Sequence, residues 1–189
     1  MKIFKRIVIA LIVLAIIGII FRGWIYRRLV NYESIGQRRN YAAIDSTLIN
    51  LLNANEGNIE PDINKIIHTS LSLTAQQLNF TTGNNDEDPN KLIYSRNANC
   101  VGYAAFFSVT CNQLLKKTNL FEEWSAHPQI GLLYCLGNNV HTYFKSAFFK
   151  DHDFVIVKNK KTGQTLAVDP SVNDCTGIEY VTLRRKHSQ

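Results

Sequence analysis

Three residues of this 189-residue chain have the types and the order that nucleophilic acyl chemistry needs: Cys100, His152 and Asp169. Cys100 begins an apolar run that continues to Phe107, and the other two residues adjoin segments that are rich in Val and Ile. An ordinary thiol is only a few per cent thiolate at neutral pH, and the partial positive charge at the start of a helix raises that fraction. A His on a neighbouring strand can act as the base, and an Asp on the next strand can hold that His in the productive tautomer.

Each of the three residues also has an ordinary structural interpretation. A Cys at the head of an apolar helix is often a small buried hydrophobe, and an Asp-Pro pair after a strand often forms a turn. A single His in an alternating strand is often structural as well. The hypothesis of a catalytic triad is favoured because the three residues lie on the elements that the chemistry requires.

Three short segments around these residues resemble the Cys, His and Asp boxes of the transglutaminase-like cysteine hydrolase superfamily. They are Cys100-Val-Gly-Tyr-Ala, His152-Asp-Phe-Val-Ile-Val and Val168-Asp-Pro-Ser, and the resemblance covers about residues 63–172. It implies an α+β fold in which a central helix with the nucleophile packs on an antiparallel sheet that carries the His and the Asp. Two residues after the His, Phe154 stands where the family often has Trp.

The resemblance also implies a role for each residue. Cys100 would be the nucleophile, His152 the general acid and base, and Asp169 the carboxylate that orients the imidazole. The reaction would be hydrolysis or acyl transfer at a peptide or protein amide, through a thioester intermediate and without a cofactor. For the oxyanion we expect two donors: the backbone N–H of Cys100 and a side chain from residues 94–99. A different hypothesis keeps the fold without catalysis, as a membrane-tethered module that binds a peptide or a partner.

The pattern of apolar residues predicts helices first and strands afterwards. A period near 3.6 residues predicts an amphipathic helix over residues 35–53, and Pro61 is placed to open a second helix that ends near residue 78. The third predicted helix, residues 100–117, is apolar nearly all round and should be buried. A polar loop is expected at residues 81–90, a break at 53–58, and strands at 130–135, 153–158 and 164–169.

The last two predicted strands should form a hairpin across residues 159–163. If Lys158 faced Gln164, Asp169 would point to the opposite face of the sheet from His152. A shift of one residue, supplied by a bulge at Gly163, would place His152 directly across from Asp169 on one face.

The amino terminus predicts a membrane anchor. Residues 7–21 are all apolar or Gly, with Lys2, Lys5 and Arg6 before them and Arg22 after them. Fifteen residues fall short of a bilayer span, but residues 23–26 continue the helix, so the expected membrane contact runs over residues 7–26. A cleaved signal peptide is the alternative, and the missing small-residue cleavage site favours an uncleaved anchor. A short segment before the apolar run favours a cytoplasmic N-terminus, with the domain on the extracytoplasmic side, which is the periplasm in a Gram-negative cell.

The positive charge of the chain is confined to this anchor. Of 21 Lys and Arg residues, six lie within residues 1–28, which leaves 15 to balance all 15 Asp and Glu. We therefore expect no nucleic-acid partner for the neutral remainder. The chain divides into an anchor (1–28), a connecting amphipathic helix (29–60) and a transglutaminase-like domain (61–189), with a solvated basic tail at residues 184–186.

No cysteine or histidine pattern indicates a metal site or a disulfide framework. Cys111 lies about 16 Å along the helix from Cys100 and is expected to be a core thiol, whereas Cys135 and Cys175 could pair only outside the cytoplasm. His141 and the acidic residues around His152 lack metal-binding spacing.

Overall fold

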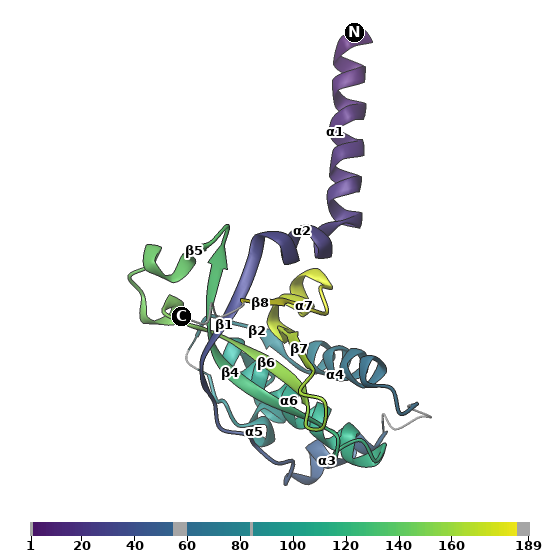
Figure 1. Ribbon diagram of the computed structural model, residues 1–189, viewed down its shortest axis with the longest axis vertical. Coiled ribbons are helices and arrows are strands. Elements are labelled where there is room, and N and C mark those ends of the chain that lie inside the picture. Colours follow the sequence, from purple (N-terminus) through teal and green to yellow (C-terminus); the bar gives the residue numbers. More distant parts are fainter. Residues whose placement is uncertain (1, 55–59, 84, 185–189) are drawn as a thin grey trace.

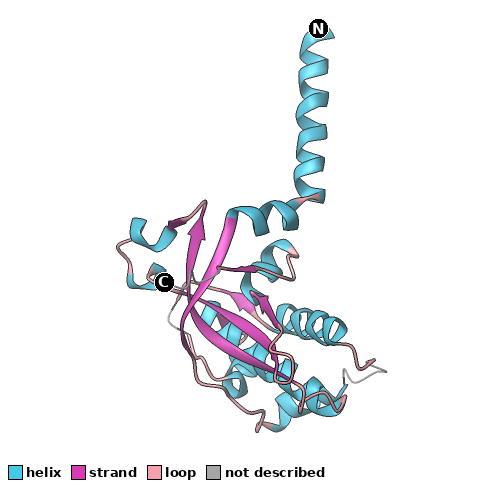
Figure 2. Cartoon of the chain, viewed as in Figure 1, coloured by secondary structure: helices cyan, strands magenta, loops and turns pink. Residues whose placement is uncertain are grey.

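Helices dominate the first two thirds of the chain, and the sheet is completed by strands from both ends of it (Figures 1 and 2). The structure is a computed structural model and describes residues 2–54, 60–83 and 85–184; the side chains of residues 2, 3 and 147 are also outside the description. The expected α+β class is confirmed. Residues 55–58 of the predicted break and 185–186 of the predicted tail lie outside the described residues.

The helices are α1 (Lys2–Ile20), α2 (Arg22–Leu29), α3 (Ser46–Ala54), α4 (Ile63–Gln77), α5 (Pro89–Ser95), α6 (Cys100–Lys117) and α7 (Pro170–Thr176), with short 3-10 turns η1 (Val140–Tyr143) and η2 (Ala147–Phe149). The strands are β1 (Val30–Gln37), β2 (Asn79–Phe80), β3 (Asn97–Ala98), β4 (Trp124–Cys135), β5 (Asn138–Asn139), β6 (His152–Asn159), β7 (Thr165–Val168) and β8 (Thr182–Leu183).

The main sheet has the order β7-β6-β4-β1-β8, and β5 pairs with β4 at its end. Neighbouring strands are antiparallel except β8, which runs parallel to β1, so the expected purely antiparallel sheet is corrected to a mixed one. Val181 precedes β8 and pairs with Ala167 of β7, so the two edges of the sheet approach each other. The sheet therefore curls around an apolar interior that contains Tyr32 and Phe154.

Helix α6 matches the predicted helix at residues 100–117 and is central to the domain. One side packs with α4 on the sheet, in a cluster that includes Phe107, Leu115 and Val155. The other side packs against α3 and α5 through Tyr103 and Phe106. Burial on both sides is why this helix is apolar nearly all round.

The predicted helix at residues 35–53 is wrong over its first half. Residues 30–37 form β1, which lies between β4 and β8, and only Ser46–Ala54 is helical. Ile35 and Ile44, which would lie on the apolar face of that helix, are both exposed. The sheet therefore takes in residues 30–37, so the division that starts the domain at residue 61 is also corrected.

Two short helices were missed, although each begins at an Asp-Pro pair. Asp88 caps α5 by accepting from the Asn90 N–H, and Asp169 caps α7 by accepting from the N–H groups of Ser171 and Val172. Asp at the N-cap followed by Pro at the first helical position is a strong helix-start signal. The loop expected at residues 81–90 ends at residue 88 where α5 begins, and the Asp169-Pro170 pair opens a helix instead of forming only a turn.

Helix α1 projects away from the domain with its apolar side chains exposed (Figure 1). A turn at Phe21 separates it from α2, and the two helices are bent by 71°. Within the described residues, no single helix is long and apolar enough to cross a membrane, and only this bent pair meets the requirements of length and composition together. Helix α2 contacts the domain, since Arg22 Nε donates to the Thr176 carbonyl at 2.6 Å. Residues 23–26 are helical as expected, but they lie after the bend.

Candidate functional site

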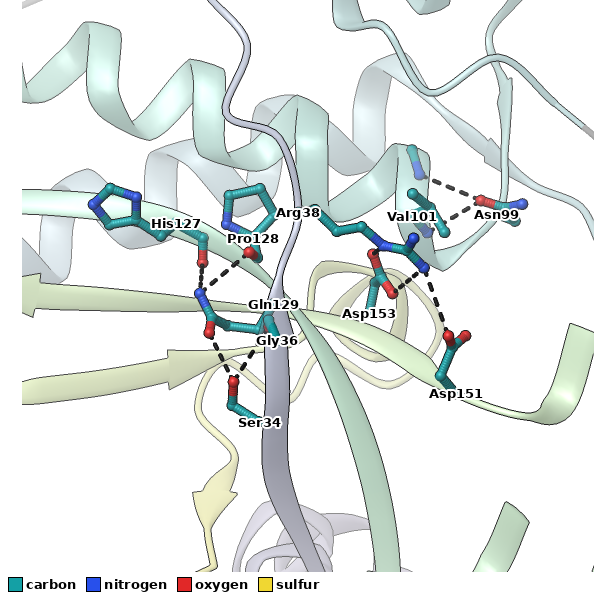
Figure 3. Close-up of polar contacts among 11 residues, drawn as sticks. Ser34, Gly36, Arg38, Asn99, Val101, His127, Pro128, Gln129, Asp151 and Asp153 are labelled. Carbon is teal, nitrogen blue, oxygen red and sulfur yellow. Dashed lines mark hydrogen bonds and ion pairs between the residues drawn. The ribbon is translucent and has the colours of Figure 1, made fainter. Parts of the chain in front are cut away.

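Cys100 is the first residue of α6 and lies almost entirely buried, with 6 % of its surface exposed. Asn99 caps the helix, because its side-chain oxygen accepts from the N–H groups of Val101 and Gly102 (Figure 3). The Cys100 N–H belongs to the first turn and has no acceptor within the helix. The sulfur thus lies at the positive end of a buried helix.

His152 is the first residue of β6 and reaches Asp169 across the β6–β7 hairpin. The hairpin pairs Val155 with Val168, a register that differs from both registers considered from the sequence. If this register continues past the end of β7, Asp169 lies opposite Phe154. Asp169 and His152 are then diagonal neighbours on the same face of the sheet. The predicted direct pairing is therefore wrong, but the predicted shared face is correct. Gly163 has φ +75°, the left-handed conformation expected for it in the connecting loop.

Asp169 divides its two carboxylate oxygens between the imidazole and helix α7. Oδ2 accepts from His152 Nε2 at 2.6 Å. Oδ1 accepts from Ser171 N at 3.1 Å, from Ser171 Oγ at 2.7 Å and from Val172 N at 3.1 Å. The carboxylate is fully buried, so these bonds replace the water that it loses on folding.

The electrostatics of the pair favour an imidazolium beside a carboxylate. Burial alone would lower the pKa of His152, but the charge and hydrogen bond of Asp169, together with the hydrogen bond to Cys100, raise it well above its usual value. Burial alone would raise the pKa of Asp169, yet the charge of His152 and the hydrogen bonds that the carboxylate accepts lower it. The structure thus brings together all three residues selected from the sequence. Because Asp169 holds Nε2, the remaining ring nitrogen of His152 is Nδ1.

Two tyrosines extend this network, and the sequence analysis missed both. The hydroxyl of Tyr32, a fully buried residue of β1, donates to Asp169 Oδ2 at 2.7 Å. Tyr26 of α2 lies 2.6 Å from that hydroxyl and acts as the donor, since the single proton of Tyr32 is already engaged with Asp169. No local motif marks Tyr32, because its role depends on β1 pairing with β4, about 100 residues further along the chain.

Gly131 leaves room for the rings on this face. It pairs with His152, and a Cβ at this position would come within 2.6 Å of the Phe154 ring. Phe154 packs edge to face on Tyr32, with ring centroids 5.2 Å apart, and Tyr32 makes a similar contact with His152 at 6.1 Å. These ring contacts limit the motion of the imidazole.

Asp153 points to the other face of the sheet and belongs to a separate ion-pair network. Arg38 binds it with two hydrogen bonds, at 2.8 and 3.2 Å, and lies 3.7 Å from Asp151 (Figure 3). Burial raises the pKa of Asp153, while the hydrogen bond from Arg38 opposes that rise. Among the described residues, no group of three or more His, Cys, Asp or Glu side chains could hold a metal ion.

A largely apolar pocket of about 270 Å³ opens beside Cys100 and His152. The segment between β4 and β6 forms most of its wall. His141 holds that segment in place, because its Nε2 accepts from Leu133 N at 3.0 Å and its Nδ1 donates to the Phe149 carbonyl at 2.8 Å. His141, considered in the sequence as an isolated possible ligand, is therefore a structural residue.

The expected oxyanion side chain from residues 94–99 is not found in the pocket. The hydroxyl of Tyr94 bonds to Asp45, the guanidinium of Arg96 bonds to backbone carbonyls of α4, and Asn99 is the helix cap. Thr82, an exposed residue, lines the pocket together with Cys100 and brings a hydroxyl to that wall.

The other cysteines have different surroundings. Cys111 is a core thiol as predicted, and burial raises its pKa to about 12. Cys135 is half-buried and Cys175 is exposed, and both are free in this structure.

Comparison of the chain with protein-family models, with curated proteins and with solved structures finds no match.

Proposed function

We propose that this chain is a membrane-anchored thiol hydrolase or acyltransferase of the transglutaminase-like type, which acts on peptide or carboxamide bonds through a thioester at Cys100. The observation that carries the proposal is the 2.6 Å contact between His152 and Asp169, in a site where the hydrogen bond to Cys100 also raises the pKa of His152. A Cys, a His and an Asp in contact at the head of a buried helix are the parts that nucleophilic acyl transfer needs.

In the proposed reaction, the sulfur of Cys100 attacks the carbonyl carbon after its proton passes to His152 Nδ1. The carbonyl oxygen becomes an oxyanion, and the first-turn N–H of Cys100 is one donor to it. As the C–N bond breaks, His152 returns its proton to the leaving amine nitrogen. Water or a second amine then attacks the thioester, which releases the acyl group and restores the thiol. Asp169 holds the imidazole and stabilises its charged form throughout.

Helix α1 is the proposed membrane contact. Its apolar side chains are exposed, and the domain already engages α2 through Arg22 and Tyr26, so the anchor would end near residue 20 rather than residue 26. The proposed orientation keeps the N-terminus in the cytoplasm and the domain outside. A thiol reagent that does not cross membranes should then label Cys100 in intact spheroplasts, and protection of Cys100 would reverse the orientation.

Thiol labelling of the full chain in detergent tests the catalytic proposal. An ordinary thiol is below about one per cent thiolate at pH 6, so iodoacetamide at that pH should modify Cys100 much faster than Cys135 or Cys175, and Cys111 slowest of all. The substitution His152→Ala should remove this advantage. The binding module without catalysis would be favoured by equal labelling of Cys100 and the exposed Cys175, or by a labelling rate of Cys100 that is the same in the His152→Ala variant.

A further inference from the structure

We propose that the pocket beside Cys100 binds a bulky apolar side chain, aromatic or branched aliphatic, on the acyl side of the scissile bond of a peptide substrate. This inference rests on the proposed function and adds a substrate class to it. Its basis is the position of the pocket, the chemistry of its wall and its size.

The position of the pocket ties it to the reacting bond. Cys100 and His152 both form part of its wall, and Cys100 is among the groups that raise the pKa of His152. A carbonyl carbon attacked by the Cys100 sulfur must lie within bonding approach of it, so a substituent of that carbon has to enter the same space. The acyl substituent stays attached to the sulfur in the thioester, whereas the leaving amine departs.

The wall of the pocket offers apolar contact almost everywhere. Its apolar members come from three parts of the chain: Phe80, Leu133, Val140, Phe144, Phe148 and Phe149. The aromatic members stack on one another, with ring centroids 4.8 Å apart for Phe144 and Phe149 and 4.9 Å apart for Phe148 and Phe149. Such a surface is typical of sites for apolar groups.

The polar members of the wall have little capacity to bind a polar side chain. Both ring nitrogens of His141 are engaged with backbone groups, and Asp151 lies in an ion-pair cluster with Arg38. Cys100 and His152 take part in the proposed reaction, so they do not bind the side chain. The exposed Thr82 is the remaining polar residue of the wall, so a polar side chain would replace few of the hydrogen bonds that it makes to water, and an acidic one would also meet the carboxylate of Asp151.

The size of the pocket fits one large side chain. A cavity of about 150 Å³ is enough to hold benzene, and this pocket measures about 270 Å³. The benzyl group of Phe or the isobutyl group of Leu fits with space left for the carbonyl. His141 fixes the wall to β4, so the pocket exists before the substrate arrives.

Chloromethyl ketones of acetylated amino acids test the inference on the full chain in detergent. The Cys100 sulfur forms a bond to the methylene carbon, chloride leaves, and mass spectrometry reports the rate of modification. We expect the Phe and Leu reagents to modify Cys100 at least about tenfold faster than the Gly reagent, and the Asp reagent to be the slowest. Iodoacetamide, which has no side chain, gives the intrinsic reactivity of the thiol.

A pair of neighbouring substitutions supplies the control. Phe144→Asp removes an aromatic wall from a residue that is 44 % exposed, and it should slow the Phe reagent about tenfold relative to the iodoacetamide rate of the same variant. Tyr143→Asp changes a 74 % exposed residue of the same segment that does not line the pocket, and it should alter neither rate. Phe149→Asp, at a second partly exposed wall position, should repeat the result of Phe144→Asp.

The outcomes separate this inference from the proposed function. Equal rates for the Phe, Gly and Asp reagents, with rapid labelling of Cys100 by iodoacetamide, would overturn the pocket assignment and leave the nucleophile in place. Slow labelling by every reagent would overturn both. A rate that depends only on apolar groups in the leaving amine of a peptide substrate would place the pocket on the other side of the bond and overturn the inference as well.

Discussion

The two sides of the His152 ring are opposite in character. On one side, Asp169 and Tyr32 form a buried polar network in which the carboxylate accepts five hydrogen bonds. On the other side lies a pocket walled by Phe and Leu side chains, with few polar groups free to bind. The imidazole and the Cys100 sulfur lie at the boundary between the two.

This difference assigns a different task to each side. A saturated polar network has no free donor or acceptor for a substrate, so it can only hold and charge the imidazole. An apolar wall cannot orient a proton, so it can only bind and exclude water. Substitutions on the polar side should therefore change the chemistry and its pH dependence, while substitutions in the pocket should change the choice of substrate.

The largest effect is expected from Asp169→Asn. Asn is as good a helix N-cap as Asp, so the substitution keeps the cap of α7 and removes mainly the charge beside His152. The loss of an orienting carboxylate in comparable triads lowers turnover by on the order of 10⁴-fold. Because the charge of Asp169 helps to raise the pKa of His152, the variant should hold the imidazolium only at lower pH, and the fast labelling of Cys100 near pH 6 should be lost. Turnover of a peptide substrate measures the first effect, and iodoacetamide labelling from pH 5 to 10 measures the second.

Asp153→Asn is the matched control for this prediction. It removes a buried carboxylate from the next residue, on the other face of the sheet, and breaks the pair with Arg38. Removing one partner of a fully buried ion pair costs about 3–5 kcal/mol, but Arg38 is 32 % exposed and can be solvated, so this variant should melt earlier by less than that cost implies. The comparison would fail if Asp153→Asn lowered the labelling of Cys100 near pH 6 as far as Asp169→Asn does.

Tyr32→Phe should have an intermediate effect. It removes one donor to Asp169 Oδ2 and keeps the ring that packs on Phe154 and His152. A buried hydrogen bond to a charged group contributes about 1.5–3 kcal/mol, which sets an upper bound of about 10- to 150-fold on the loss of reactivity.

The acid stability of Tyr32→Phe gives a second measurement. The folded-state pKa of Asp169 is depressed, so its contribution to stability is present above the unfolded value and is lost as the pH falls through the folded pKa. The bond from Tyr32 is one of the causes of that depression, so the midpoint of acid unfolding should move to higher pH in Tyr32→Phe. Tyr180→Phe, which removes a surface hydroxyl bond to Asn64, should leave that midpoint unchanged.

Only some residues of the polar side of the site could be predicted from the sequence. Cys100, His152 and Asp169 stand out because reactive residue types adjoin strong local patterns, and α6 is predicted to the residue because its apolar run is long and ends in lysines. Tyr32 carries no such signal. It lies in a strand whose two partner strands are about 100 and 150 residues away in the chain. The apolar residues from position 35 onward recur with the period of a helix, so the local pattern did not predict that strand. The aromatic pocket depends in the same way on side chains gathered from three separate segments.

The smallest effect is expected from Tyr26→Phe, and it tests whether the network reaches the anchor. Tyr26 lies on α2, directly after α1, and its hydroxyl bonds to Tyr32 rather than to Asp169. Its loss removes a neutral, partly buried hydrogen bond, worth about 0.5–1.5 kcal/mol of stability, and only a fraction of that should be transmitted to His152. We therefore expect a two- to threefold loss of Cys100 labelling with an unchanged pH profile. In the double variant with Tyr32→Phe, Tyr26→Phe should add nothing, because the hydroxyl through which it acts is already gone. An additive loss in the double variant would show that α2 influences the site by another route than this pair of hydroxyls.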